Sequence, residues 1–172
     1  EDNALLRSVR LKDGLIQFLN NLEVKATNPN DSKTFLTPTG FRPLDEAWNG
    51  GIRKQSLVLV AARPGNCKTT FLLNAALNAA LHYNIPTAFL SFEMGLDEVL
   101  LILFSMLTEK LFPNEGVPTS KLEQPHKLTP DDWYKLVRAI KAMRDIPMYL
   151  EDCDGMTTLQ LEAKIMKLSK MG

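Results

Sequence analysis

The feature that most constrains this chain is a loop set between an apolar run and a helical segment. The apolar run covers residues 57–61, and Lys68 opens the helical segment. This order matches the phosphate-binding template G-x-x-x-x-G-K-[ST], which joins a buried strand to a helix N-terminus. Lys68 and Thr69 fit the template, whereas Ala62 and Cys67 replace its two glycines. The pattern therefore predicts an α/β fold that carries a nucleotide-binding loop.

The loop supplies most of what phosphate binding requires. Backbone N–H groups of such loops surround the phosphates, and the helix N-terminus adds about half a positive charge. Lys68 is placed to reach the β- and γ-phosphate oxygens, and the Thr69 hydroxyl to bind Mg²⁺. Thr70 is placed to contact a further phosphate. The predicted nucleotide-binding residues are Ala62, Arg63, Pro64, Gly65, Asn66, Cys67, Lys68, Thr69 and Thr70.

Cys67 leaves the strength of this site open. Glycine at its position lets the backbone approach the phosphates without a Cβ atom in the way. One interpretation is that Cys67 is a small residue in a loop that still binds nucleotide. The other, which we favour, is that its side chain weakens or abolishes binding. A reactive thiolate is a minor third interpretation, supported only by the helix N-terminus and by the neighbouring Lys68.

Strand and helix patterns alternate after Gly50. The predicted strands are residues 56–62, 87–92 and 147–151, and the predicted helices are residues 68–83, 96–112, 130–144 and 158–171. Such alternation is typical of a parallel sheet flanked by helices. Residues 114–127 contain two prolines and are predicted to be a loop or a disordered segment.

A carboxylate follows the second predicted strand, in the string Ser91-Phe92-Glu93-Met94. The carboxyl ends of adjacent parallel strands open on the same crevice as the phosphate loop. Glu93 is thus placed to orient and deprotonate an attacking water molecule. Position alone favours a simpler role, in which Glu93 caps the following helix. Asp152 and Asp154 present a similar choice between the site and a solvated loop.

An amphipathic helix is predicted near the N-terminus, over residues 5–24. Its apolar positions are Leu11, Leu15, Phe18 and Leu22. They fall on one face because their spacing follows the helical repeat. Residues 25–33 are polar and turn-rich, so we predict a linker and a boundary near Thr34. The apolar face would pack on the chain's own core or on a neighbouring subunit, and the pattern favours neither.

Composition and charge exclude several classes of protein. Lys plus Arg and Asp plus Glu number 20 each, so no basic excess indicates broad contact with nucleic acid or membrane. The longest apolar run, residues 99–107, is far shorter than the roughly 20 residues of a membrane-spanning helix. Cys67 and Cys153 lack the number and spacing of a disulfide framework or a zinc site. We therefore expect a soluble, cytoplasmic protein without a membrane partner.

Further strings accompany the loop in a fixed order. They are Thr39-Gly40-Phe41 with Leu44-Asp45, Gly50-Gly51, Ala61-Ala62-Arg63-Pro64-Gly65, Lys68-Thr69-Thr70 and Ser91-Phe92-Glu93-Met94, with weaker matches over residues 128–133 and 148–157. From about Thr37 to the C-terminus, the chain resembles the RecA-like ATPase domain of DnaB-type bacterial and phage replicative DNA helicases. The resemblance implies a hexameric ring that unwinds duplex DNA with ATP and Mg²⁺. It also raises a primase and a helicase loader as partners.

The resemblance assigns roles to individual residues. Alanine is usual at the first loop position in these helicases, so Ala62 is not a defect, whereas the family has glycine where Cys67 stands. Glu93 matches the catalytic glutamate and joins Lys68 as a catalytic residue. The helix over residues 5–24 matches the place of the linker helix, which packs on the adjacent motor domain.

These matches imply two parts of the chain. Residues 1–33 would be the linker helix and linker, which dock on a neighbouring subunit, and residues 34–172 the N-terminal part of a RecA-like ATPase domain. In the family, the strand with the Walker B aspartate follows the position of Met171-Gly172, and the DNA-binding loops and arginine finger come later. We expect either that the natural polypeptide continues or that this piece is not a working motor.

Two alternative functions remain open at this point. A regulatory protein could join helicase rings without hydrolysing ATP, which would suit Cys67 and the missing Walker B strand. Another RecA-like ATPase, of the recombinase or clock type, would share the fold and the loop. That second alternative does not explain why the Thr-Gly-Phe and Glu-Met strings occur together.

Overall fold

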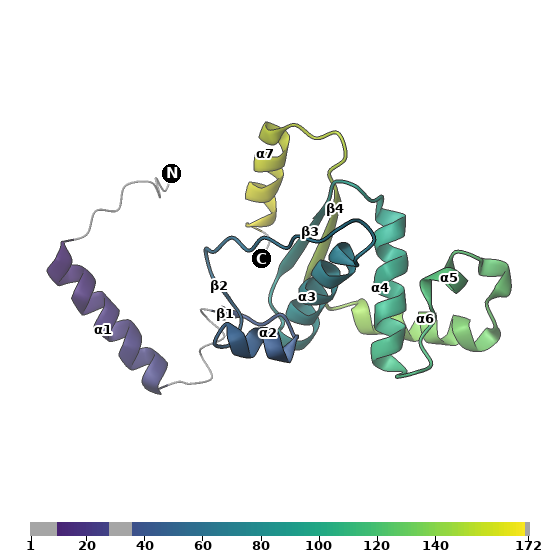
Figure 1. The fold of residues 1–172 in the computed structure, drawn as a ribbon, viewed down its shortest axis with the longest axis horizontal. Helices are drawn as coiled ribbons and strands as arrows, with labels where there is room; N and C mark the ends of the chain where they lie inside the picture. The colour runs from purple at the N-terminus through teal and green to yellow at the C-terminus, as the bar shows by residue number, and fades with distance from the viewer. Residues whose placement is uncertain (1–9, 28–35, 171–172) are drawn as a thin grey trace.

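The computed structural model describes residues 10–27 and 36–170. Helix α1 (Leu11–Thr27) is followed by an α/β body, from which it lies apart (Figure 1). The helix predicted over residues 5–24 is thus confirmed in its described part and extends to Thr27. Its predicted start and the boundary near Thr34 lie outside the described residues.

The body alternates helices and strands as the sequence predicts. In chain order its elements are β1 (Leu36–Thr37), α2 (Arg42–Ala47), β2 (Ile52–Arg53), α3 (Lys68–Tyr83), β3 (Thr87–Ser91), α4 (Leu96–Leu111), α5 (Thr119–Leu122), the 3-10 helix η2 (Pro125–Lys127), α6 (Pro130–Met143), β4 (Met148–Asp152) and α7 (Thr158–Leu168). Strands β3 and β4 pair in parallel, with Thr87 opposite Met148 and Ser91 opposite Asp152. Strands β1 and β2 form a separate antiparallel pair.

Helices cover both faces of the β3–β4 pair. Phe89 and Leu150 pack against the core formed by α3 and α4. Ala88 and Tyr149, on the opposite face, line a groove together with Leu168 of α7. Because successive strand residues point to opposite faces, this division follows directly from the period of two. The predicted α/β class, with a parallel sheet flanked by helices, is confirmed.

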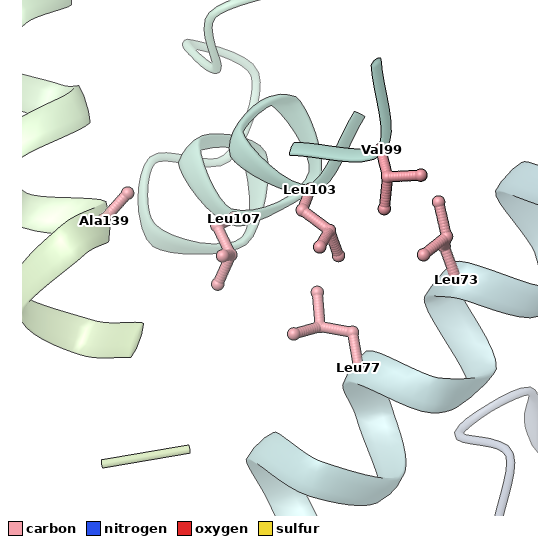
Figure 2. Packing of buried hydrophobic residues seen from close by; sticks show 6 residues of the cluster. All are labelled: Leu73, Leu77, Val99, Leu103, Leu107 and Ala139. Carbon is pink, nitrogen blue, oxygen red and sulfur yellow. The ribbon is translucent and has the colours of Figure 1, made fainter. Parts of the chain in front are cut away.

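The core lies between α3, α4 and α6. Its buried residues are Leu73, Leu77, Val99, Leu103, Leu107 and Ala139. Figure 2 shows the leucines of α3 facing Val99 and Leu103 of α4. This packing fixes α3, whose N-terminus carries the predicted phosphate loop, against the rest of the body.

The prediction of a strand over residues 56–62 is wrong. The segment is irregular and pairs with no described strand. The side chains of Leu57 and Leu59 are 85% and 84% exposed. An apolar run becomes a strand only when neighbouring strands accept its backbone hydrogen bonds, and no described strand does so here.

The loop predicted over residues 114–127 contains α5 and η2. Long-range contacts order it. The Lys135 ammonium donates to the Glu115 carbonyl at 2.9 Å and forms an ion pair with the Glu115 carboxylate at 3.4 Å. Val117 and Leu122 are buried in a second small core. These contacts reach across about twenty residues, so local composition could not reveal them.

The helix starts of α6 and α7 follow local sequence. The Thr129 and Asp132 side chains each accept a hydrogen bond from the other residue's backbone N–H, which forms a capping box. Hydrogen bonds from Lys121 and from Thr129 lower the pKa of Asp132 to about 2. Thr157 and Gln160 form the same arrangement at α7.

Among the described residues, no helix combines the length and the apolar character that a membrane span requires.

Candidate nucleotide-binding site

The predicted phosphate loop lies at the N-terminus of α3. The helix begins at Lys68, and Cys67 is its N-cap residue, with φ 54° and ψ 26° in the left-handed region. Gly65 also has positive φ, at 81°, and the Asn66 N–H donates to the Arg63 carbonyl at 3.2 Å. The loop is thus a sequence of turns that leads directly into a helix of 16 residues.

This arrangement fits an anionic phosphate. The first-turn N–H groups of a helix have no partner within the helix, and the side chain of Cys67 does not cap them. Residues 61–67 are exposed, and a Cβ atom placed on Gly65 would meet nothing within 4 Å. Free donors, open space and the positive end of the helix dipole together favour a bound anion.

Cys67 adopts the backbone conformation that glycine usually provides. A left-handed conformation costs a residue with a Cβ atom about 1–2 kcal/mol. The loop keeps this shape despite the cysteine, and the Cys67 side chain is exposed. The geometry therefore explains why glycine suits position 67, while the effect of Cys67 on affinity stays a prediction.

The three residues after the loop lie in the first turn of α3. Lys68, Thr69 and Thr70 are partly buried. The Phe71 N–H donates to the Cys67 carbonyl at 2.9 Å, which closes this turn. The amine and hydroxyl groups named from the sequence are thus held on a regular backbone beside the loop.

The turn after β3 forms the second part of the site. The Ser91 hydroxyl donates to the Met94 carbonyl at 2.6 Å and accepts from the Met94 N–H at 3.3 Å. Glu93 lies within this closed turn and is exposed. The N-cap residue of α4 is Gly95, without a side-chain cap. The interpretation of Glu93 as the helix cap is therefore wrong.

A shared cavity brings the two parts together. Thr70 and Met94 both line a cavity of about 490 Å³. The start of α3 therefore lies beside the turn that carries Glu93. Asp152, the last residue of β4, is exposed at the same end of the sheet, where it lies opposite Ser91.

The acidic loop after β4 is organised by its own contacts. The Asp154 N–H donates to the Asp152 carboxylate at 3.0 Å, which is a local turn typical of a solvated loop. The Cys153 N–H donates to the Ser91 carbonyl at 2.8 Å and extends the pairing of β4 with β3. Burial raises the pKa of the Cys153 thiol, so this cysteine stays protonated beside the site.

One residue near the site had no role in the sequence analysis. The Phe71 ring directly follows Thr70 and stacks on the Phe41 ring, with centroids 4.8 Å apart. The only sequence signal of this contact is the string Thr39-Gly40-Phe41, which identifies a family and not a contact.

Comparisons with known proteins agree with this geometry. The family model of the DnaB-like helicase C-terminal domain matches residues 37–172. The replicative DNA helicase DnaB of Leifsonia xyli subsp. xyli is 33% identical over 150 residues, which cover 86% of this chain and 30% of that protein. The replicative DNA helicase DnaB of Geobacillus stearothermophilus is 31% identical over 160 residues, which cover 93% of this chain and 33% of that protein. The chain therefore spans about a third of the length of these relatives.

A solved structure matches the fold. The ATPase domain of G40P superposes with a TM-score of 0.75 at 22% identity. The match covers 96% of this chain and 54% of that one. At this identity the similarity shows a shared fold and leaves the roles of individual residues to chemical argument.

Proposed function

Since this chain belongs to the family of DnaB-like helicase C-terminal domains, we propose that it is the ATP-hydrolysing motor portion of a replicative DNA helicase. The motor would couple Mg-ATP hydrolysis to the unwinding of duplex DNA. The observation that best supports this proposal is the uncapped N-terminus of α3 with its loop of positive-φ turns, beside the turn that carries Glu93. The remaining parts of the activity, including DNA binding, are inferred from the relatives.

In the proposed reaction each group of this chain has a defined task. The backbone N–H groups of the loop and the Lys68 ammonium hold the β- and γ-phosphates. The Thr69 hydroxyl is the chain's ligand for Mg²⁺, which when bound neutralises charge on the phosphates. Glu93 accepts the proton of the water that attacks the γ-phosphorus, and the products are ADP and inorganic phosphate.

We assign residues 1–33 to subunit docking and residues 34–172 to the ATPase part. The described face of α1 exposes Leu11, Leu15, Phe18, Leu19 and Leu22. Because α1 lies apart from the body (Figure 1), the core of the body does not cover this face. A neighbouring copy in a hexameric ring would cover it. A cytoplasmic location and contacts with a primase and a helicase loader complete the proposal.

The activity is tested on the gene product that contains this chain. We expect Mg²⁺-dependent ATP hydrolysis that DNA stimulates, together with unwinding of a forked duplex. ATP binding without hydrolysis, with or without DNA, would contradict the proposal and favour the ring-joining regulator. ATP-dependent pairing of homologous strands without unwinding would instead favour the recombinase type.

Replacing Cys67 with glycine is expected to raise nucleotide affinity. Cys67→Gly removes the Cβ atom at the phosphate approach. The left-handed backbone at Cys67 is already present without nucleotide, so relief of its strain stabilises the free and the bound protein alike. We expect the Kd for Mg-ATP to fall by about tenfold, a difference of about 1.4 kcal/mol. Titration with a fluorescent ATP analogue measures this.

The matched control for that experiment is Cys67→Ala. Alanine removes the sulfur and keeps the Cβ atom, so it separates the effect of the thiol from that of the Cβ atom. Tighter binding only with glycine would identify the Cβ atom as the cause. Equal affinity of the wild type and Cys67→Gly would show that the cysteine is harmless.

A further inference from the structure

We propose that Asp45 is a positioning residue for the phosphate loop. Its carboxylate fixes the turn over residues 39–41, and this turn holds α3 at two points, Asn78 and Phe71. The proposal rests on the nucleotide site inferred above and adds to it a residue outside the loop.

The Asp45 carboxylate organises the turn by accepting three hydrogen bonds. The Thr39 N–H and hydroxyl donate to Oδ1 at 2.8 and 2.7 Å. The Gly40 N–H donates to Oδ2 at 2.9 Å. Hydrogen bonds to an ionised group are shorter and stronger than those between neutral groups. Asp45, on α2, therefore determines the conformation of a turn that precedes its helix.

The turn holds α3 first at Asn78. The Asn78 amide donates to the Thr39 carbonyl at 2.9 Å, and its oxygen accepts from the Lys110 ammonium at 2.8 Å. Thr39 and Asn78 are 2% and 5% exposed, so this link lies in the interior. A Cβ atom on Gly40 would lie 2.3 Å from the Asn78 nitrogen. Only glycine lets the turn approach α3 this closely, which gives a physical reason for the glycine in the Thr-Gly-Phe string.

The turn holds α3 a second time through an aromatic pair. The Phe41 and Phe71 rings stack with centroids 4.8 Å apart and planes 19° apart. Phe71 follows Thr70, and its N–H donates to the carbonyl of Cys67 at 2.9 Å. The ring contact therefore acts on the same helical turn that bears Lys68 and Thr69.

These contacts bear on catalysis because the loop has little other support. Residues 61–67 are exposed, and residues 56–62 pair with no described strand. The position of the loop is therefore set largely through α3. Misplacement of a reacting group by about 1 Å can cost about 10²-fold in rate. A loosened turn at residues 39–41 would thus change nucleotide binding without touching the nucleotide.

The test is Asp45→Asn in the gene product that contains this chain. Asparagine keeps the shape, but it removes the charge and presents an amide to one of the backbone donors. We expect faster hydrogen exchange of the Asn66 and Phe71 amides, which are hydrogen-bonded to the Arg63 and Cys67 carbonyls in the nucleotide-free protein. We also expect the Kd and KM for Mg-ATP to rise by about tenfold. Both are measured well below the melting temperature, after circular dichroism has confirmed the fold.

The control is Glu46→Gln, which removes the adjacent carboxylate from the same helix. Glu46 is exposed and pairs with Arg42 of its own helix, so exchange and affinity should stay as in the wild type. A lower melting temperature of Asp45→Asn with unchanged exchange and affinity would overturn the proposal and leave a merely structural role. If Asp45→Asn does not fold, Phe41→Leu decides, because it keeps an apolar side chain and removes the ring stack. Unchanged exchange of the Asn66 and Phe71 amides in that variant would also overturn the proposal.

A failure of the proposed function gives a different result. In that case the wild type itself would bind no Mg-ATP, at any temperature tested. The exchange measurement needs no nucleotide and still tests whether Asp45 positions the loop.

Discussion

Glu93→Gln is expected to lower ATP turnover by about 10²- to 10⁴-fold while ATP remains bound. Glutamine has almost the same shape as glutamate, but it cannot accept a proton from the attacking water. Glu93 is exposed and lies in a turn that Ser91 closes without it, so the fold should not change. Phosphate release in steady state and titration with an ATP analogue measure the two effects separately.

Two further variants make this experiment specific. Glu98→Gln removes another exposed carboxylate, from α4 and on the cavity that Thr70 and Met94 share, and should leave turnover unchanged. Lys68→Ala should lose nucleotide binding together with hydrolysis, because in the proposed reaction the lysine holds the phosphates in the ground state as well. Retained turnover in Glu93→Gln would remove Glu93 from the role of base. Asp152, exposed at the same end of the sheet, would then be the next residue to replace.

Local sequence signals predicted the elements that show a clear period of apolar residues or a turn signal at their ends. Helix α3 begins and ends at the predicted residues, and β3, β4 and α4 lie within two residues of their predicted bounds. Each has a clear period, a turn signal at its end, or both. The position of the phosphate loop followed from the same signals, since the loop is defined by the helix that it opens.

Elements that depend on distant partners were missed or mispredicted. Residues 56–62 have the composition of a buried strand, but a strand also needs a neighbour, and composition does not supply one. Residues 114–127 look polar and proline-rich, yet Lys135 and a buried Val117 order the segment. The short elements β1, α2 and β2 gave no periodic signal, because two to six residues complete no pattern.

The same distinction applies to the candidate site. The roles proposed for Lys68, Thr69 and Glu93 come from motifs, because each motif is contiguous. The link from Asp45 through Thr39 to Asn78 could not, since it joins residues 39 positions apart. A string such as Thr-Gly-Phe records that a contact is needed without stating which residue it meets.

Phe18→Asp is expected to convert the gene product that contains this chain from a ring to monomers. Phe18 is exposed in the middle of the apolar face of α1. If a neighbouring copy covers this face, the substitution buries an isolated carboxylate there. The free energy needed to remove that charge from water exceeds the free energy that the phenylalanine contact contributes to association. Sedimentation velocity at a fixed protein concentration measures the change. Circular dichroism and Mg-ATP binding should stay close to wild type, because α1 lies apart from the body.

Asn20→Asp provides the matched control, since it introduces the same charge on the opposite face of the same helix. It should leave the ring intact, whereas Leu15→Asp, on the apolar face, should dissociate it as Phe18→Asp does. If both apolar-face variants keep the ring, α1 does not dock on a neighbour. If they instead lower the melting temperature of the body, the face packs on the chain's own core. The comparison thus distinguishes packing of α1 on a neighbouring subunit from packing on the chain's own core, between which the helical pattern alone did not decide.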